Sequence, residues 1–124
     1  MCPAAGQGAL AIEIREGDAT MRDHLKFLDD PTARAAVHCE RSLLNRMGGG
    51  CQVPIGALAE MRSGKLHLES VVANPDGSQV LRDFRDGDDP KSLGEAAADE
   101  LLRRGGDKIL AEVYKHISTL PQQP

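Results

Sequence analysis

The sequence predicts an α+β fold: a three-stranded antiparallel sheet with helices packed on one face, preceded by a short remnant of an α/β domain. Three observations predict it. Apolar residues follow a helical spacing from residue 18 to 47, alternate as in strands from 55 to 85, and return to helical spacing after residue 92. Two turn sequences divide the middle part into three segments, which predicts a meander of hairpins. Because a three-stranded sheet needs cover on one face, the flanking helices are expected to supply it.

Residues 1–28 are expected to be the C-terminal remnant of a preceding domain. The run ALAIEI at 9–14 is almost wholly apolar, which is typical of a strand covered on both faces. No preceding residues supply its neighbours, so the chain is expected to begin within a larger protein. Asp18 is expected to cap a short helix with apolar residues at helical spacing, namely Met21, Leu25 and Leu28.

Residues 29–117 are expected to form one domain. Its first helix is predicted to begin with Asp30 as the cap and Pro31 at the first helical position, and to end at the glycine triplet 48–50. The apolar stripe of this helix is expected to consist of Ala33, Ala36, Val37, Leu44 and Met47.

Two chemically distinct side chains lie in or beside that stripe. Cys39 is expected to be a buried structural thiol, since free cysteines usually behave as small apolar residues. Glu40 is expected to be a buried carboxylate that needs a partner, and Arg41 or Arg34 is the expected ion-pair partner.

Three strands are predicted at 55–61, 65–73 and 78–85, with turns at 62–64 and 74–77. A helix is expected to follow through Ser92, which has Glu95 at the spacing of a capping box. The apolar face of that helix is expected to comprise Ala96, Ala97, Leu101 and Leu102. After Gly105 and Gly106, a last helix capped by Asp107 is expected to bury Ile109, Leu110 and Val113, and residues 118–124 are expected to form a flexible tail.

Composition narrows the class of protein. The 124 residues are 40% hydrophobic and 27% charged, with a net charge of −4 and only 2% aromatic residues. Without a basic run or aromatic platforms, nucleic acid is not expected as a partner. Neither a run of ~18 apolar residues nor a signal-peptide pattern is present, so no membrane partner and a cytoplasmic location are expected. The three cysteines lack metal-ligand spacing, so no metal site is expected.

The segment RMGGGCQVPIG at 46–56 carries the sharpest candidate site. Cys51 lies between glycines and a proline, where backbone can yield around a bulky group, and Arg46 is a possible cation for a thiolate. The residues alone also allow Cys51 to be a small apolar residue in a helix-to-strand turn. At the other end of the chain, Gly6-Gln7-Gly8 can present an amide and backbone N–H groups to a ligand, or can form a plain turn.

Several stretches together resemble the porphobilinogen deaminase (hydroxymethylbilane synthase) family. They are PAAGQGALAIE at 3–13, ERSLL at 40–44, GGCQVPIG at 49–56, PDG at 75–77 and LAEV at 110–113. The resemblance spans nearly the whole chain in the family's order, and the cysteine motif is highly specific.

The resemblance implies a transferase that condenses porphobilinogen head-to-tail into hydroxymethylbilane, in tetrapyrrole and haem biosynthesis. It implies that Cys51, flanked by Gly49 and Gly50, carries a dipyrromethane cofactor through a thioether, and that Gln7 and Gly8 line the substrate cleft. The matching part is the end of the family's second domain and its third domain. The family's catalytic aspartate has no counterpart in this chain, so the chain alone is expected to lack catalytic residues and to be inactive. The partners of the full-length enzyme are expected to be porphobilinogen and the growing oligopyrrole.

The residues alone also allow two other hypotheses about the function. One is a non-catalytic α+β ligand-binding module with a glycine-rich loop, and the other is a thiol-redox domain that pairs Cys51 with Cys39. The full-length protein is expected to be a monomer. This chain is expected to self-associate through residues 9–14, because an apolar edge invites pairing with another copy.

Overall fold

A computed structural model describes residues 2–48 and 53–119, with side chains described as far as residue 115. Its elements in chain order are α1 (Ala19–Leu25), the 3-10 turn η1 (Lys26–Leu28), α2 (Pro31–Arg46), β1 (Ile55–Arg62), β2 (Lys65–Ala73), β3 (Val80–Gly87), α3 (Pro90–Leu101), the π-helical turn η2 (Leu102–Gly106) and α4 (Asp107–Thr119). The predicted α+β class is confirmed.

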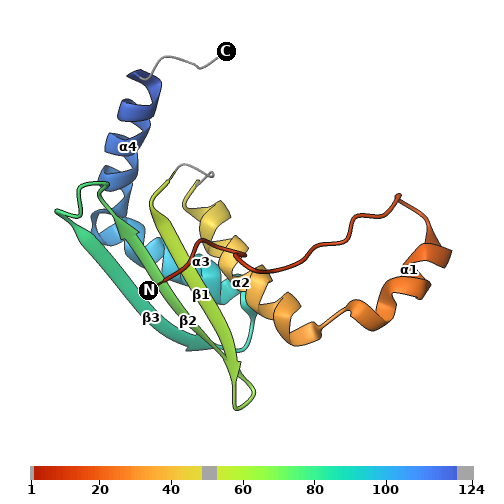
Figure 1. The fold of residues 1–124 in the computed structure, drawn as a ribbon. Helices are drawn as coiled ribbons and strands as arrows, with labels where there is room; N and C mark the ends of the chain where they lie inside the picture. Colours follow the sequence, from red (N-terminus) through yellow and green to blue (C-terminus); the bar gives the residue numbers. More distant parts are fainter. Residues whose placement is uncertain (1, 49–52, 120–124) are drawn as a thin grey trace.

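In the part of the chain that the structure describes, the strands form one antiparallel sheet in the order β1-β2-β3 (Figure 1). The first hairpin turns through Ser63 and Gly64, both with positive φ, which suits a tight two-residue connection. The second turn is closed by the N–H of Gly77, which donates to the carbonyl of Asn74 at 2.9 Å. Both turns lie where the sequence predicts them.

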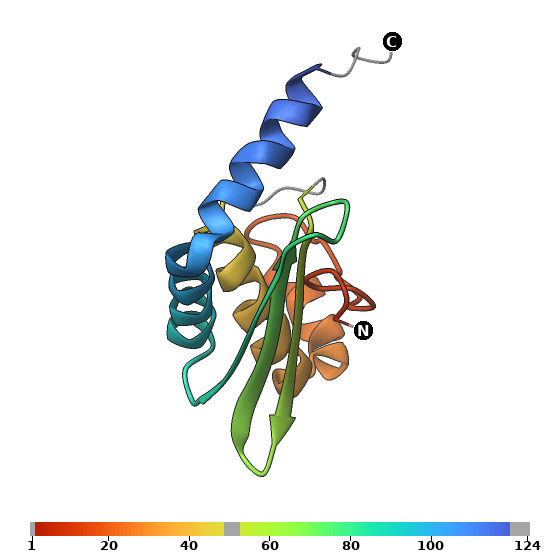
Figure 2. The same cartoon turned by 90° about the vertical axis from the view of Figure 1, so that its left-hand side faces the viewer.

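Helices α2 and α3 cover one face of the sheet, as Figures 1 and 2 show. Alternate β2 residues face them and are buried: Leu66, Leu68, Ser70 and Val72. The two helices also approach each other closely at Gly94, where an added Cβ would lie 2.3 Å from the carbonyl oxygen of Cys39. Glycine is therefore required at the helix crossing.

This crossing corrects the predicted apolar stripes of both helices. On α2 the buried side is Cys39, Leu43 and Met47, whereas Ala33 is exposed. On α3 it is Leu93, Ala97, Ala98 and Leu101, whereas Ala96 is exposed. Each helix packs against both the sheet and the other helix. Its buried residues therefore lie on a different side from the stripe that apolar spacing alone predicts.

The helix starts agree with prediction in α1 and α2 and differ afterwards. Asp18 and Asp30 cap α1 and α2 as expected. Helix α3 starts earlier than predicted: Asp89, rather than Ser92, is its cap. Asp107 already has helical φ and ψ inside a chain that bends at Gly105 (φ 108°), so it is the first residue of α4 and not a cap.

Residues 9–14 do not form the predicted strand. Their backbone is irregular, and Leu10 and Ile12 are 99% and 56% exposed. The reason is that no described strand lies beside them to accept backbone hydrogen bonds. Together with α1 and η1 they form an arm, residues 9–28, that extends away from the sheet (Figure 1).

Candidate functional site

The structure describes the residues on both sides of the segment 49–52, which contains Cys51 and is called the cysteine loop below. Helix α2 ends at Met47, and Gly48 has a left-handed φ of 66°, with its N–H donating to the carbonyl of Asn45 at 3.1 Å. The described residues resume at Val53, and β1 begins at Ile55. Gly49, Gly50 and Cys51 lie outside the described residues, so the loop is placed by its two ends: the C-terminus of α2 and the start of β1.

Tyr114 contacts the first of these ends. Its O–H donates to the carbonyl of Gly48 at 2.6 Å, which links α4 to the base of the loop. Tyr114 lies four residues after Leu110 and one after Val113, both buried, so the predicted apolar side of α4 brings it there. The sequence did not indicate this contact, because nothing local to Tyr114 shows that it reaches Gly48, 66 residues earlier in the chain.

Arg46 does not lie free beside the loop. Its guanidinium donates two hydrogen bonds to the carboxylate of Asp99 on α3, at 2.8 and 3.3 Å, and this contact raises the pKa of Arg46. A positive charge already paired with a carboxylate has little left to stabilise a thiolate. Arg46 is therefore already engaged by Asp99, and its role as a cation for Cys51 stays a prediction.

Gln7 and Gly8 lie in a turn at the other end of the chain. The N–H of Gln7 donates to the carbonyl of Ala4 at 3.0 Å, and the side-chain oxygen of Gln7 accepts from the N–H of Ala4 at 3.2 Å. Both Gln7 and Gly8 are exposed, and Gly8 has φ 83°. The turn thus presents Gln7 to solvent, and the cleft role of Gln7 and Gly8 stays a prediction.

Glu40 has different partners from those predicted. Its carboxylate is 7% exposed and accepts from two backbone N–H groups, that of Gly6 at 2.7 Å and that of Ala59 at 2.8 Å. Arg34 pairs instead with Asp29. The predicted ion pair with Arg41 or Arg34 is wrong, because backbone donors from two segments already satisfy both carboxylate oxygens.

The two described cysteines are poor nucleophiles. Cys39 is fully buried, as predicted, and burial raises its pKa to about 11, with the nearby carboxylates of Glu40 and Asp89 adding to the effect. Burial also raises the pKa of Cys2, whose thiol contacts the carbonyl of Glu69. Because the thiolate is the reactive form, neither suits redox chemistry near neutral pH.

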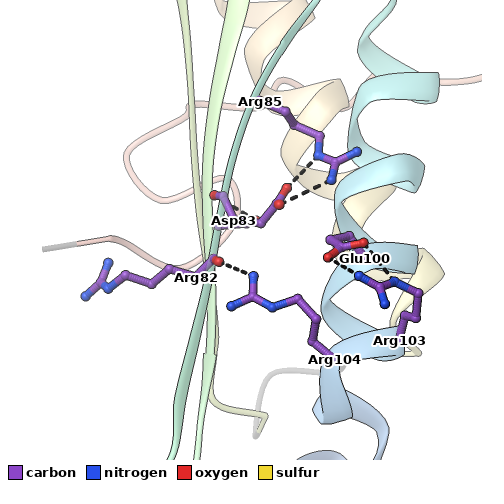
Figure 3. A network of polar contacts seen from close by, with 7 residues as sticks. Arg82, Asp83, Arg85, Glu100, Arg103 and Arg104 are labelled. Carbon is purple, nitrogen blue, oxygen red and sulfur yellow. Dashed lines mark hydrogen bonds and ion pairs between the residues drawn. The ribbon is translucent and has the colours of Figure 1, made fainter.

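Arginines gather where β3 meets the end of α3, which makes this a candidate anion site (Figure 3). Arg85 pairs with Asp83, Arg103 pairs with Glu100, and Arg104 donates to the carbonyl of Arg82 at 2.6 Å. Arg82 in turn donates to Glu69 at 2.8 Å. Three of the four arginines are paired with carboxylates, and the bond from Arg104 to the carbonyl of Arg82 joins η2 to β3, so this cluster is a packing contact rather than a site.

A hollow with a volume of about 560 Å³ lies in the arm. Leu10, Ile12 and Ile14 line one side of it, and α1 and η1 line the other. Within the same described part of the chain, no cluster of metal-ligating side chains is found, and no helix is long and apolar enough to cross a membrane.

Comparison with known proteins gives a consistent result. The family model described as "Porphobilinogen deaminase, C-terminal domain" matches residues 34–103. A porphobilinogen deaminase of Desulforudis audaxviator is 50% identical over 116 residues, which is 91% of this chain and 38% of that protein. The corresponding protein of Thiobacillus denitrificans is 49% identical over 110 residues, 87% of this chain and 36% of its own length. The chain thus spans less than two fifths of these relatives.

Proposed function

The chain belongs to the family of porphobilinogen deaminase C-terminal domains, and we propose that it is the cofactor-bearing domain of a cytoplasmic transferase that joins porphobilinogen units into hydroxymethylbilane. The observation that carries this proposal is the family match over 34–103, which includes the cysteine motif at 49–56. The whole protein acts in tetrapyrrole biosynthesis, with porphobilinogen as its substrate.

Cys51 is the proposed attachment point of a dipyrromethane cofactor. The chemistry of the two described thiols supports this choice: Cys39 is fully buried with a raised pKa, and Cys2 is half-buried with a raised pKa. A thioether needs a thiol that can meet a carbon electrophile, and it stays attached through repeated additions because it is not hydrolysed. When bound, the cofactor supplies the primer to which new pyrrole units are joined.

The residues of this chain then have separate roles. Gly49 and Gly50 give the loop backbone the freedom to shift as the attached chain grows. Gln7 and Gly8 line the cleft, and Tyr114 restrains the base of the loop through Gly48. The catalytic groups come from other parts of the whole enzyme, so the 124-residue chain alone does not turn over porphobilinogen.

The test uses the whole enzyme that contains this chain, incubated with porphobilinogen and analysed by intact mass and peptide mapping. We expect a mass gain on the Cys51 peptide and steady product formation. Cys51→Ser should abolish both, because a serine hydroxyl does not form the thioether. Cys2→Ser, the matched control, should leave both unchanged.

Two results would contradict the proposal. One is normal product formation by Cys51→Ser, and the other is sustained product formation by the 124-residue chain alone. For the glycines, Gly49→Ala with Gly50→Ala should slow later additions more than cofactor attachment, and equal slowing of both steps would refute their role.

A further inference from the structure

The outer edge of β1, which faces away from β2, forms hydrogen bonds with acceptors that do not belong to a strand. β1 is the first strand of the sheet, with β2 on one side only in the described residues. Two of the N–H groups on its outer side, those of Ala57 and Ala59, donate to the carbonyl of Pro3 and to the carboxylate of Glu40, both at 2.8 Å. At these two positions, a backbone carbonyl and a side-chain carboxylate therefore accept the hydrogen bonds that a neighbouring strand would accept.

Glu40 also holds the segment that supplies that carbonyl. Its second oxygen accepts from the N–H of Gly6 at 2.7 Å, inside the turn that contains Gln7. The segment sits close on β1: an added Cβ on Gly56 would lie 3.0 Å from the carbonyl oxygen of Pro3. One carboxylate thus joins α2, β1 and residues 2–8.

This joint requires a carboxylate of glutamate length. The two N–H donors approach different oxygens of the carboxylate, and Glu40 is 7% exposed, so water gives little compensation if either acceptor is lost. Glutamine has one acceptor and would turn an NH₂ group toward one of the two donors. Aspartate keeps both oxygens but is shorter by one methylene, so it cannot reach both segments.

We infer that Glu40 is a positioning residue that fixes residues 2–8 relative to α2 and β1, the two elements that flank the cysteine loop. In the proposed enzyme, this attachment fixes the distance from the cleft residues Gln7 and Gly8 to the pyrrole chain on Cys51. The inference about the enzyme rests on the proposed function. The hydrogen bonds from Gly6 and Ala59 to Glu40, called the joint here, are seen in the structure and do not depend on that function.

Amide hydrogen exchange of the 124-residue chain tests the joint directly. In the wild type the amide of Gly6 should exchange slowly although it lies in no helix or strand. Glu40→Gln should accelerate that exchange about tenfold or more, the effect of losing one buried hydrogen bond to a charged group. Asp30→Ala is the matched control: it removes a carboxylate that caps the same helix through Thr32 and Ala33 but does not contact residues 2–8.

Fast exchange of Gly6 in the wild type, or equal acceleration in Glu40→Gln and Asp30→Ala, would overturn the inference. In the whole enzyme, Glu40→Gln should lower kcat for porphobilinogen consumption about tenfold with the mass gain on Cys51 unchanged, and an unaltered kcat would overturn the positioning role. If the wild-type enzyme gains no mass on Cys51, the proposed function fails, while the exchange experiment still decides whether Glu40 holds the segment.

Discussion

At the scale of single residues, burial decides what each cysteine can do. Cys39 lies under α3 at the helix crossing, fully excluded from solvent, and burial raises its pKa to about 11 from an ordinary value of 9.0. A shift of two pKa units leaves about a hundredfold less thiolate at a given neutral pH. The side chain of Cys39 therefore serves to fill the core, although a thiol could in principle react as a nucleophile.

Cys39 in the native chain should resist alkylation. We expect iodoacetamide at pH 8 to modify it at least about a hundredfold more slowly than in the same chain unfolded by guanidinium, because both thiolate and access are reduced. Peptide mapping by mass spectrometry at timed intervals measures the rate. Native and unfolded chains that react at similar rates would show that Cys39 is not held in the core.

At the scale of elements, helix starts depend on which carboxylate reaches the free N–H groups. Asp89 accepts from the N–H of Ser92 at 2.8 Å and so caps α3, one residue before Pro90. The hydrogen bonds from Ser92 lower the pKa of Asp89. The predicted cap, Ser92, is itself inside the first turn, where its N–H is the group that needs a partner.

Asp89→Ala should lower the melting temperature at pH 7, whereas Ser92→Ala should change it little. Because the folded-state pKa of Asp89 is lowered, its stabilisation is present above the ordinary carboxyl pKa of 3.8 and is lost as the pH falls through the lowered value. The difference between wild type and Asp89→Ala should therefore shrink toward pH 3. Thermal unfolding followed by circular dichroism at several pH values measures it, and a difference that does not depend on pH would contradict the role.

At the scale of the whole molecule, the arm differs from the domain that it precedes. Its apolar side chains are unusually exposed, with Leu10 at 99% and Phe27 at 81%, and none of the residues of α1 is buried. If the proposed function holds, we expect other parts of the whole enzyme to cover these side chains. In the 124-residue chain alone, a second copy is the available partner.

The 124-residue chain should therefore show a concentration-dependent dimer in analytical ultracentrifugation. Leu10→Asp together with Phe27→Asp should shift it to monomer, because charges on the arm oppose its burial. Val80→Asp is the matched control, since Val80 is an exposed apolar residue outside the arm. A monomer at all concentrations, or equal loss of dimer in the control, would argue against association through the arm.

The sequence by itself determined the order of helices and strands from residue 19 onward, the meander and its two turns. These features depend on local chemistry: apolar spacing, proline and aspartate at helix starts, and glycine where φ is positive. It also determined the family, because the motif around Cys51 and the residues at 3–13 and 40–44 keep their order along the chain.

Only the tertiary structure decided the partners of Glu40, the buried sides of α2 and α3, and the fate of residues 9–14. Each depends on groups far apart in the chain. Gly6 and Ala59 are 34 and 19 residues from Glu40, and Gly94 meets Cys39 across a helix crossing. Residues 9–14 have strand-like sequence, but a strand needs a neighbour to accept its hydrogen bonds, and periodicity carries no information about whether one is there.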